Sequence, residues 1–251
     1  MKIVNPQISF VMPTRDRGNI ISQSIKTIID QTIKNWELIV VDDHSKAGDK
    51  TKKAVQSFND SRIRYIRIPD RWSGGIAEAR NFGNMFARAP IIAVADSDDL
   101  YMPERAKLTI DAFKKYNCDV FYGQYDILNI NTGVVGKRIK TPILDFDIDL
   151  IKKYNLIPNI SSAYKREIAY EFPYNSFFRK ASDYDFFARL AKAGKKFYFC
   201  PTIVARAIVH GGNITLDTQF GTGYGDLLKN NMGWNKKNKE EILYKILHKT
   251  K

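Results

Sequence analysis

Residues 91–99 read IIAVADSDD, an apolar run that ends in a cluster of carboxylates. The apolar part has the length and β-branched content of a buried strand. Asp96, Asp98 and Asp99 follow it directly, and like charges beside a low-dielectric core repel one another unless a cation neutralises them. Their oxygens suit Mg²⁺ or Mn²⁺, usually accompanied by a phosphate. A second reading is a polar turn in which Ser97 or Asp99 caps the next helix.

The rest of the first half of the chain alternates short β-branched runs with longer segments of helical spacing. The predicted strands cover residues 8–12, 37–41, 63–68, 91–95 and 120–125. The predicted helices have apolar faces within residues 21–29 and 76–87, and a third helix opens at Pro103 and runs through Lys115. This alternation is typical of a mostly parallel sheet flanked by helices, in which ligands bind outside the carboxyl ends of the strands.

Polar clusters follow the predicted strands at those ends. Pro13, Thr14 and Arg15 follow the first strand, Asp43 follows the second, and Arg80 lies in the helix that opens after the third. Each cluster alone is explained by a helix cap, a tight turn or a solvated helix residue. Their occurrence in one register predicts a single crevice that collects them all.

Composition limits the class of protein. With 251 residues, of which 44% are hydrophobic, the chain suffices for one large domain or one domain with an appendage. Two distant cysteines, Cys118 and Cys200, indicate reduced packing residues in a cytosolic compartment. No apolar run reaches about 18 residues, so neither secretion nor a membrane span is expected.

The net charge of +13 calls for an anionic partner. Nucleic acid, an acidic membrane surface and a phosphorylated substrate all qualify. The basic residues are scattered along the chain, and the carboxylate clusters would repel a phosphate backbone. Nucleic acid is therefore not expected as a partner.

Four motifs together resemble the family 2 glycosyltransferases, which have the GT-A fold. They read ISFVMPTRDR at 8–17, WELIVVDDHS at 36–45, SGGIAEARN at 73–81 and DSDDLYMP at 96–103. The resemblance covers about residues 6–210 and implies a Rossmann-like α/β fold with a smaller acceptor-side region. It also implies transfer of a sugar from a nucleotide-diphosphate sugar to an acceptor hydroxyl, with inversion at the anomeric carbon, in surface polysaccharide or glycoconjugate synthesis. Arg15 and Asp16 stand where the family more often has Tyr-Asn.

The same resemblance assigns roles to single residues. Asp43 matches the residue that holds the nucleobase, and a carboxylate accepts hydrogen bonds from bases with an N–H edge. A UDP-sugar is thus the expected donor, with dTDP- and GDP-sugars as alternatives. Asp98 matches the ligand of Mn²⁺ or Mg²⁺, and Asp96 the residue at the ribose or the metal's water shell. Arg80 adds charge-assisted hydrogen bonds to the nucleotide. Residues 13–15 help to form the pocket that binds the nucleotide.

Residues 180–190, KASDYDFFARL, resemble the family segment EDYDLWLRL. In that match Asp183 is the general base that takes the proton of the acceptor hydroxyl. Ser182 replaces a more usual acidic residue, and an alternative is that Ser182 or Asp183 only caps a helix. His210, beside two glycines, matches a position at which some members contact the metal or the diphosphate, and an imidazole ligand favours Mn²⁺.

The predicted boundaries give a GT-A domain over residues 1–215, with a nucleotide-sugar half at 1–125 and an acceptor half at 126–215. Residues 216–251 are predicted to form a lid and a basic helical tail. That tail either packs on the domain or docks on an anionic membrane, where a lipid-linked acceptor waits. The expected location is cytoplasmic, peripheral at the membrane face in the second case, and the expected acceptor is a glycan or a lipid-linked glycan.

Other classes remain open from the sequence. A nucleotidyltransferase would show a Gly-rich activation loop with Arg and Lys after the first strand, which residues 13–18 lack. A catalytically inactive nucleotide-sugar-binding protein would have the same fold, and Ser182 is the one hint toward it. A basic nucleic-acid-binding protein would explain the net charge.

Overall fold

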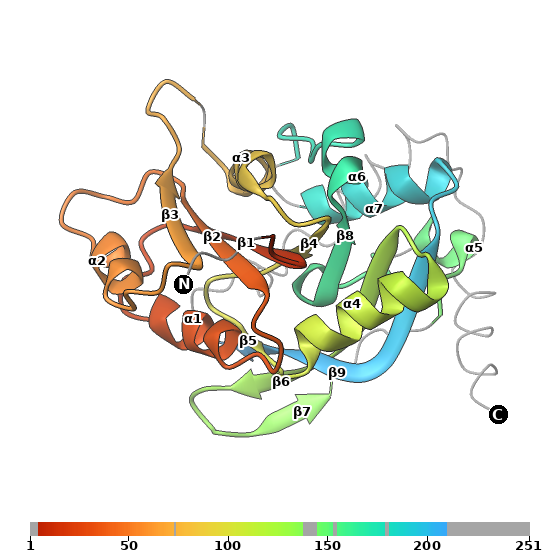
Figure 1. The fold of residues 1–251 in the computed structure, drawn as a ribbon, viewed down its shortest axis with the longest axis horizontal. Coiled ribbons are helices and arrows are strands. Elements are labelled where there is room, and N and C mark those ends of the chain that lie inside the picture. Colours follow the sequence, from red (N-terminus) through yellow and green to blue (C-terminus); the bar gives the residue numbers. More distant parts are fainter. Residues whose placement is uncertain (1–4, 73, 138–144, 153–154, 179–180, 210–251) are drawn as a thin grey trace.

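The computed structural model describes residues 5–72, 74–137, 145–152, 155–178 and 181–209 (Figure 1). The strands are β1 (Ile8–Thr14), β2 (Trp36–Asp42), β3 (Ile63–Arg67), β4 (Ile91–Val94), β5 (Leu100–Tyr101), β6 (Val120–Asn129), β7 (Val135–Lys137), β8 (Ser162–Lys165) and β9 (Phe197–Val209). The helices are α1 (Ile21–Ile29), α2 (Thr51–Gln56), α3 (Ile76–Phe86), α4 (Arg105–Tyr116), α5 (Ile148–Ile151), α6 (Arg166–Glu171) and α7 (Ser182–Lys192), with a 3₁₀ turn at Asn159–Ser161.

The described strands form one sheet in the order β3-β2-β1-β4-β8-β6-β9-β5, with β7 paired to β6. The pairs β1–β2, β1–β4, β2–β3 and β6–β9 are parallel and contain most of the paired residues. Strand β8 is antiparallel to β4 and β6, and β5 is antiparallel to β9. The predicted α/β class with a mostly parallel, helix-flanked sheet is confirmed, while the antiparallel insertions were not predicted.

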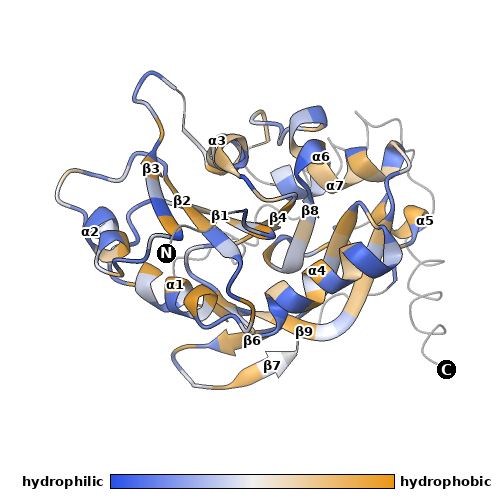
Figure 2. Cartoon of the chain, in the orientation of Figure 1, coloured by the Kyte–Doolittle hydropathy of each residue, from blue (hydrophilic) through white to orange (hydrophobic). Residues whose placement is uncertain are grey.

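The sheet separates two apolar cores because successive strand side chains point to opposite faces. Val11 of β1 packs in the core with α3, α6 and α7, whereas its neighbours Phe10 and Met12 pack in the core with α1 and α4. The covering helices carry hydrophilic and hydrophobic stripes, visible for α2 and α4 in Figure 2. The central strands β1, β2 and β4 are therefore buried along their whole length, and the helices are amphipathic.

Gly83 allows α3 to lie directly on the sheet. A Cβ atom at this position would lie 2.4 Å from Cγ1 of Val11 and 2.8 Å from Cγ2 of Val41. The missing side chain permits close contact of the helix with β1 and β2. This contact fixes where the first turn of α3 meets the carboxyl ends of those strands.

Two further expectations concern the chain as a whole. Cys118 and Cys200 are buried free thiols, as predicted. Within the described residues, no helix has the length and apolarity needed to cross a bilayer. His210 and the predicted lid and tail lie outside the described residues.

Candidate active site

The carboxyl ends of β1, β2 and β4 meet at one edge of the sheet. Thr14 is in register with Asp42, and the Asp43 N–H donates to the carbonyl of Thr14 at 2.8 Å. Ala95, which leads into the acidic motif, donates its N–H to the carbonyl of Val11 at 2.9 Å. The predicted convergence of the polar loops at this edge is confirmed for the described residues.

Asp43 is held from two sides. One carboxylate oxygen, Oδ1, lies 3.1 Å from Nδ1 of His44, and the other accepts the Gly75 N–H at 3.0 Å. A Cβ atom on Gly74 would lie 2.2 Å from Oδ1 of Asp43, so a glycine is needed for this approach. The loop before α3 is thereby tied to the end of β2.

Asp42, the neighbour of Asp43, is used inside the protein. Its carboxylate accepts the Ser45 N–H at 2.7 Å and the hydroxyl of Tyr65, and Arg67 lies 3.5 Å away. Burial and the hydrogen bond to Asp42 raise the pKa of Tyr65 above its ordinary value. These bonds place the Asp42 carboxylate inside the protein, so Asp43 is the member of the pair that remains the candidate for binding a ligand.

Arg80 connects the two halves of the site. Its guanidinium, which is 7% exposed, donates to Oδ1 of Asp96 at 3.0 Å and lies over the ring of Tyr174. Burial alone lowers the pKa of Arg80, but the electrostatic effects of Asp96, Tyr174 and Asp183 outweigh it and raise the pKa. Asp183 therefore acts electrostatically on the same cation as Asp96, although it comes from the far end of the chain.

The remaining acids of the DSDD motif differ in environment. Asp98 lies 3.5 Å from the guanidinium of Arg17 and is 18% exposed. Asp99 is buried and accepts the Ile208 N–H of β9 at 3.0 Å. Burial, together with the charges of Asp96 and Asp98, raises the pKa of Asp99 to about 8.

The alternative in which Ser97 or Asp99 caps the next helix is wrong. Helix α4 has Glu104 at its N-cap, and no side chain caps it. Asp99 instead holds β9 to the end of β4, which is a structural task.

Asp183 lies in the first turn of α7. Its Oδ2 accepts a hydrogen bond from the Asn155 amide at 2.9 Å. The helix starts after Ala181, whose φ is 62°, and no side chain caps it. The capping alternative for Ser182 and Asp183 is therefore wrong. Asp185, two residues later in the same helix, pairs with Arg189 at 2.8 Å. The two acids of this segment therefore have different surroundings.

The acidic motif fits a divalent cation that arrives with a diphosphate. Among the described residues, no group of three or more His, Cys, Asp or Glu side chains forms a ready-made metal site. Mg²⁺ is commonly held by one or two carboxylates, with phosphate oxygens and water as its other ligands. Asp96 and Asp98 supply carboxylate oxygens of the kind that such an ion prefers, and they are the partly exposed acids of the motif, whereas Asp99 is buried.

The other predicted residues lie where the strand order suggests. Pro13 and Thr14 are buried at the end of β1, and the Oγ1 of Thr14 is a buried oxygen that has no hydrogen-bond partner among the described residues. Arg15 is exposed just beyond them. The contacts add residues that the sequence analysis did not select: Arg17, His44, Asn155 and Tyr174. Arg17 stood in a quoted motif, but nothing in the sequence links Asn155 or Tyr174 to the site.

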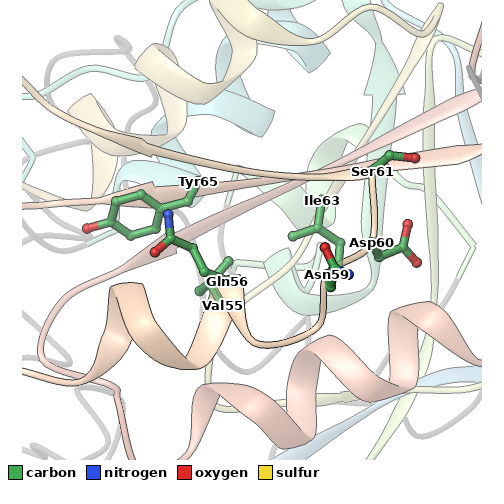
Figure 3. Close-up of a pocket in the computed structure, with 7 residues that line it drawn as sticks. All are labelled: Val55, Gln56, Asn59, Asp60, Ser61, Ile63 and Tyr65. Atoms are coloured by element: carbon green, nitrogen blue, oxygen red, sulfur yellow. The ribbon is translucent and has the colours of Figure 1, made fainter.

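A surface hollow of about 380 Å³ lies between α2 and β3 (Figure 3). Its lining residues are Val55, Gln56, Asn59, Asp60, Ser61, Ile63 and Tyr65. None of the predicted site residues is among them. Tyr65 connects the hollow to the candidate site through its hydrogen bond with Asp42.

This sheet, with its acidic motif after β4, defines the GT-A class of glycosyltransferases. The model of Glycosyl transferase family 2 matches residues 9–187, and the chain belongs to that family. The predicted family, fold class and enzyme class are thereby confirmed.

Curated relatives include two enzymes named for glycan synthesis. UDP-Glc:alpha-D-GlcNAc-diphosphoundecaprenol beta-1,3-glucosyltransferase WfgD of Escherichia coli is 38% identical over 132 residues, 53% of this chain and 50% of the relative. Poly(ribitol-phosphate) beta-N-acetylglucosaminyltransferase TarP of Staphylococcus aureus is 28% identical over 155 residues, 61% of this chain and 45% of the relative. The chain thus matches about half the length of each.

Solved structures share the fold at low identity. Residues 1–349 of S. aureus TarS in complex with UDP-GlcNAc align with a TM-score of 0.69 and 17% identity, over 82% of this chain and 60% of that one. The mannosyltransferase PcManGT of Pyrobaculum calidifontis, in complex with GDP-Man and Mn²⁺, aligns with a TM-score of 0.61 and 17% identity, over 83% of this chain and 59% of that one.

Proposed function

We propose that this chain transfers a sugar from a nucleotide-diphosphate sugar to a hydroxyl of a glycan or lipid-linked acceptor, with inversion at the anomeric carbon. The observation that supports this most directly concerns the buried Arg80. Its guanidinium donates to Asp96, and the charge of Asp183 helps to raise its pKa. One cation thus connects the nucleotide side of the site with the proposed base. Proteins with related sequences, WfgD and TarP, carry names that describe sugar transfer to a lipid-linked diphosphate and to a polymer.

In this proposal the donor lies along the carboxyl edge of the sheet. Asp43 accepts a hydrogen bond from the N–H of the base, residues 13–15 line the nucleotide, and Asp96 binds the ribose. A UDP-sugar is the first candidate, since related proteins are named with or bound to UDP compounds. GDP- and dTDP-sugars are the alternatives, and PcManGT was crystallised with GDP-Man.

The leaving diphosphate needs positive charge. Asp98 is the proposed ligand of Mn²⁺ or Mg²⁺, and His210 is a second one, although it lies outside the described residues. Such an ion supplies Lewis-acid stabilisation of the negative charge that grows on the diphosphate. Arg80 and Arg17, which lie beside Asp96 and Asp98 in this structure, are the guanidinium groups proposed to donate charge-assisted hydrogen bonds to the nucleotide.

Asp183 takes the proton of the acceptor hydroxyl as its oxygen attacks the anomeric carbon. The new bond forms on the face opposite the departing nucleoside diphosphate, so the configuration inverts. The amide of Asn155 donates to Oδ2 of Asp183, which orients the carboxylate and leaves its other oxygen for the acceptor.

The experiment screens UDP, dTDP, GDP, ADP and CDP for a rise in thermal midpoint with Mn²⁺, since a ligand that binds the folded state stabilises it. The sugar forms of the nucleotide that binds are then supplied with simple glycoside acceptors, and NMR reads the anomeric configuration of the product. Retention of configuration would exclude the single-base scheme. Absence of any nucleotide effect at millimolar concentration would exclude the proposed donor class.

The alternative functions predict different results. An inactive nucleotide-sugar-binding protein would bind a nucleotide without turnover with any acceptor. A nucleic-acid-binding protein would bind DNA with a steep salt dependence that Asp98→Asn leaves unchanged. The domain boundaries, the lid, the cytoplasmic location and the membrane contact of the basic tail stay predictions.

A further inference from the structure

His44 occupies a backbone conformation that a side chain disfavours. Its φ is 57°, in the left-handed region, where a glycine costs least because it has no Cβ atom. The residue directly follows Asp43, at the turn after β2. An imidazole at such a position raises the question of what its side chain contributes that a glycine would not.

The imidazole bonds Asp43 through one nitrogen and leaves the other without a hydrogen-bond partner. Nδ1 lies 3.1 Å from Oδ1 of Asp43. An ionised carboxylate only accepts, so Nδ1 carries the hydrogen. Nε2 is buried without a hydrogen-bond partner among the described residues, and the nearest acid, the exposed Asp70, lies 4.0 Å away. The left-handed backbone and the ring nitrogen without a partner together make His44 a candidate for a functional role.

The contribution of His44 is the orientation of Asp43. The Gly75 N–H holds Oδ2 at 3.0 Å while His44 holds Oδ1, so both carboxylate oxygens are tied and the group cannot rotate freely. Each oxygen keeps a lone pair for a further donor. The contact between His44 and Asp43 also requires a glycine at position 74, because a Cβ atom there would lie 2.9 Å from Nδ1 of His44.

We propose that His44 is a positioning residue that sets the plane of the Asp43 carboxylate and thereby the base specificity of the donor site. The proposal rests on the proposed function, in which Asp43 binds the base. A fixed carboxylate selects the ring N–H of uracil by position, whereas a carboxylate free to rotate also accepts the neighbouring exocyclic amine of cytosine. His44 is therefore expected to affect discrimination between UDP and CDP as well as affinity.

The experiment compares the wild type with His44→Gly and His44→Asn by calorimetric titration of UDP and CDP in the presence of Mn²⁺. His44→Gly relieves the backbone and removes the ring. We expect an equal or higher thermal midpoint, UDP affinity about tenfold weaker and a smaller UDP/CDP ratio. Asparagine tolerates the left-handed conformation and has an N–H donor. His44→Asn should therefore keep part of the UDP affinity and part of the UDP/CDP ratio.

Asn117→Gly is the matched control, because Asn117 also has a positive φ, 46°, but caps α4 away from the site. It should leave both affinities unchanged. If His44→Gly retains the affinity and the UDP/CDP ratio, or loses stability and affinity with an unchanged ratio, the positioning role is wrong. Failure of the wild type to bind any nucleotide would instead contradict the proposed function, and loss of binding in Asp43→Ala with normal binding in His44→Gly would contradict only the inference.

Discussion

At the scale of single residues, adjacent carboxylates perform different tasks because their surroundings differ. The Asp42 carboxylate contacts Ser45, Tyr65 and Arg67, whereas the Asp43 carboxylate is held by His44 and a backbone N–H of the loop before α3. The same division occurs in the DSDD motif, where Asp99 holds β9 and Asp98 faces Arg17. A sequence motif names the candidates, and the hydrogen-bond partners separate them.

Asp183→Asn should separate binding from chemistry. The amide keeps the size and the contact with Asn155 but cannot take a proton, so transfer should fall at least about a hundredfold. Donor affinity, measured by calorimetry, should stay within about twofold. Asp185→Asn is a comparison variant in the same helix, whose acid is already paired with Arg189. Near-normal turnover in Asp183→Asn would remove it as the base.

Asp98→Ala should abolish the part of nucleotide affinity that depends on metal. The wild type should bind UDP more tightly with Mn²⁺ than with a chelator, since a cation held by Asp98 would attract the negative charge of the diphosphate. In the variant the two affinities should be equal within error, as measured by titration calorimetry. An undiminished effect of Mn²⁺ in Asp98→Ala would place the ion elsewhere.

At the scale of elements, the position of α3 decides the geometry of the site. Its N-cap residue Gly75 donates its N–H to Asp43, its second turn provides Arg80, and its third turn packs Gly83 on the sheet. A shift of this one helix would therefore move the contacts of both Asp43 and Asp96. Helix α7 likewise determines the position of Asp183, which lies in its first turn.

Gly83→Ala should destabilise the fold although alanine is the better helix former. The added Cβ atom would overlap Val11 and Val41, and overpacking of this kind costs about 1–3 kcal/mol. Urea unfolding measures the loss. Met85→Ala, at an exposed position of the same helix, should change the free energy of unfolding by no more than about 0.5 kcal/mol. A neutral Gly83→Ala would show that α3 relaxes away from the sheet at little cost.

At the scale of the whole molecule, a buried acid joins three segments that are distant in the sequence. Glu37 of β2, which is 1% exposed, accepts hydrogen bonds from Ser9 of β1, Arg64 of β3 and Arg88 before β4. Burial opposes ionisation, but the hydrogen bonds from Ser9 and Arg88 and the charge of Arg64 lower the pKa of Glu37. This network holds the amino-terminal edge of the sheet together, opposite the site.

The lowered pKa of Glu37 gives a pH-dependent contribution to stability. A carboxyl whose pKa is lower in the folded state stabilises the fold above its ordinary pKa of 4.5, and the effect is lost as the pH falls through the folded-state value. Glu37→Gln should therefore cost about 2 kcal/mol at pH 7, and the difference from the wild type should narrow below pH 4.5. Urea unfolding at several pH values tests this.

Glu171→Gln, which removes an exposed partner of Lys195, should cost less than about 1 kcal/mol at any of these pH values. A difference between Glu37→Gln and the wild type that stays constant from pH 7 to pH 4 would show that the ionised form of Glu37 has no special role.

The sequence by itself determined the alternating strands and helices, the parallel half of the sheet and the edge at which the polar motifs meet, because these follow from local periodicity. It also identified Asp43, Asp96, Asp98 and Asp183 as candidates. Only the tertiary structure decided that Arg80 pairs with Asp96 and that Asp183 helps to raise the pKa of this arginine. It also decided that His44 contacts Asp43, and that β8 and β5 join the sheet as antiparallel strands. Contacts between residues as far apart as 81 and 174 depend on how whole elements pack, and local spacing carries no record of that packing.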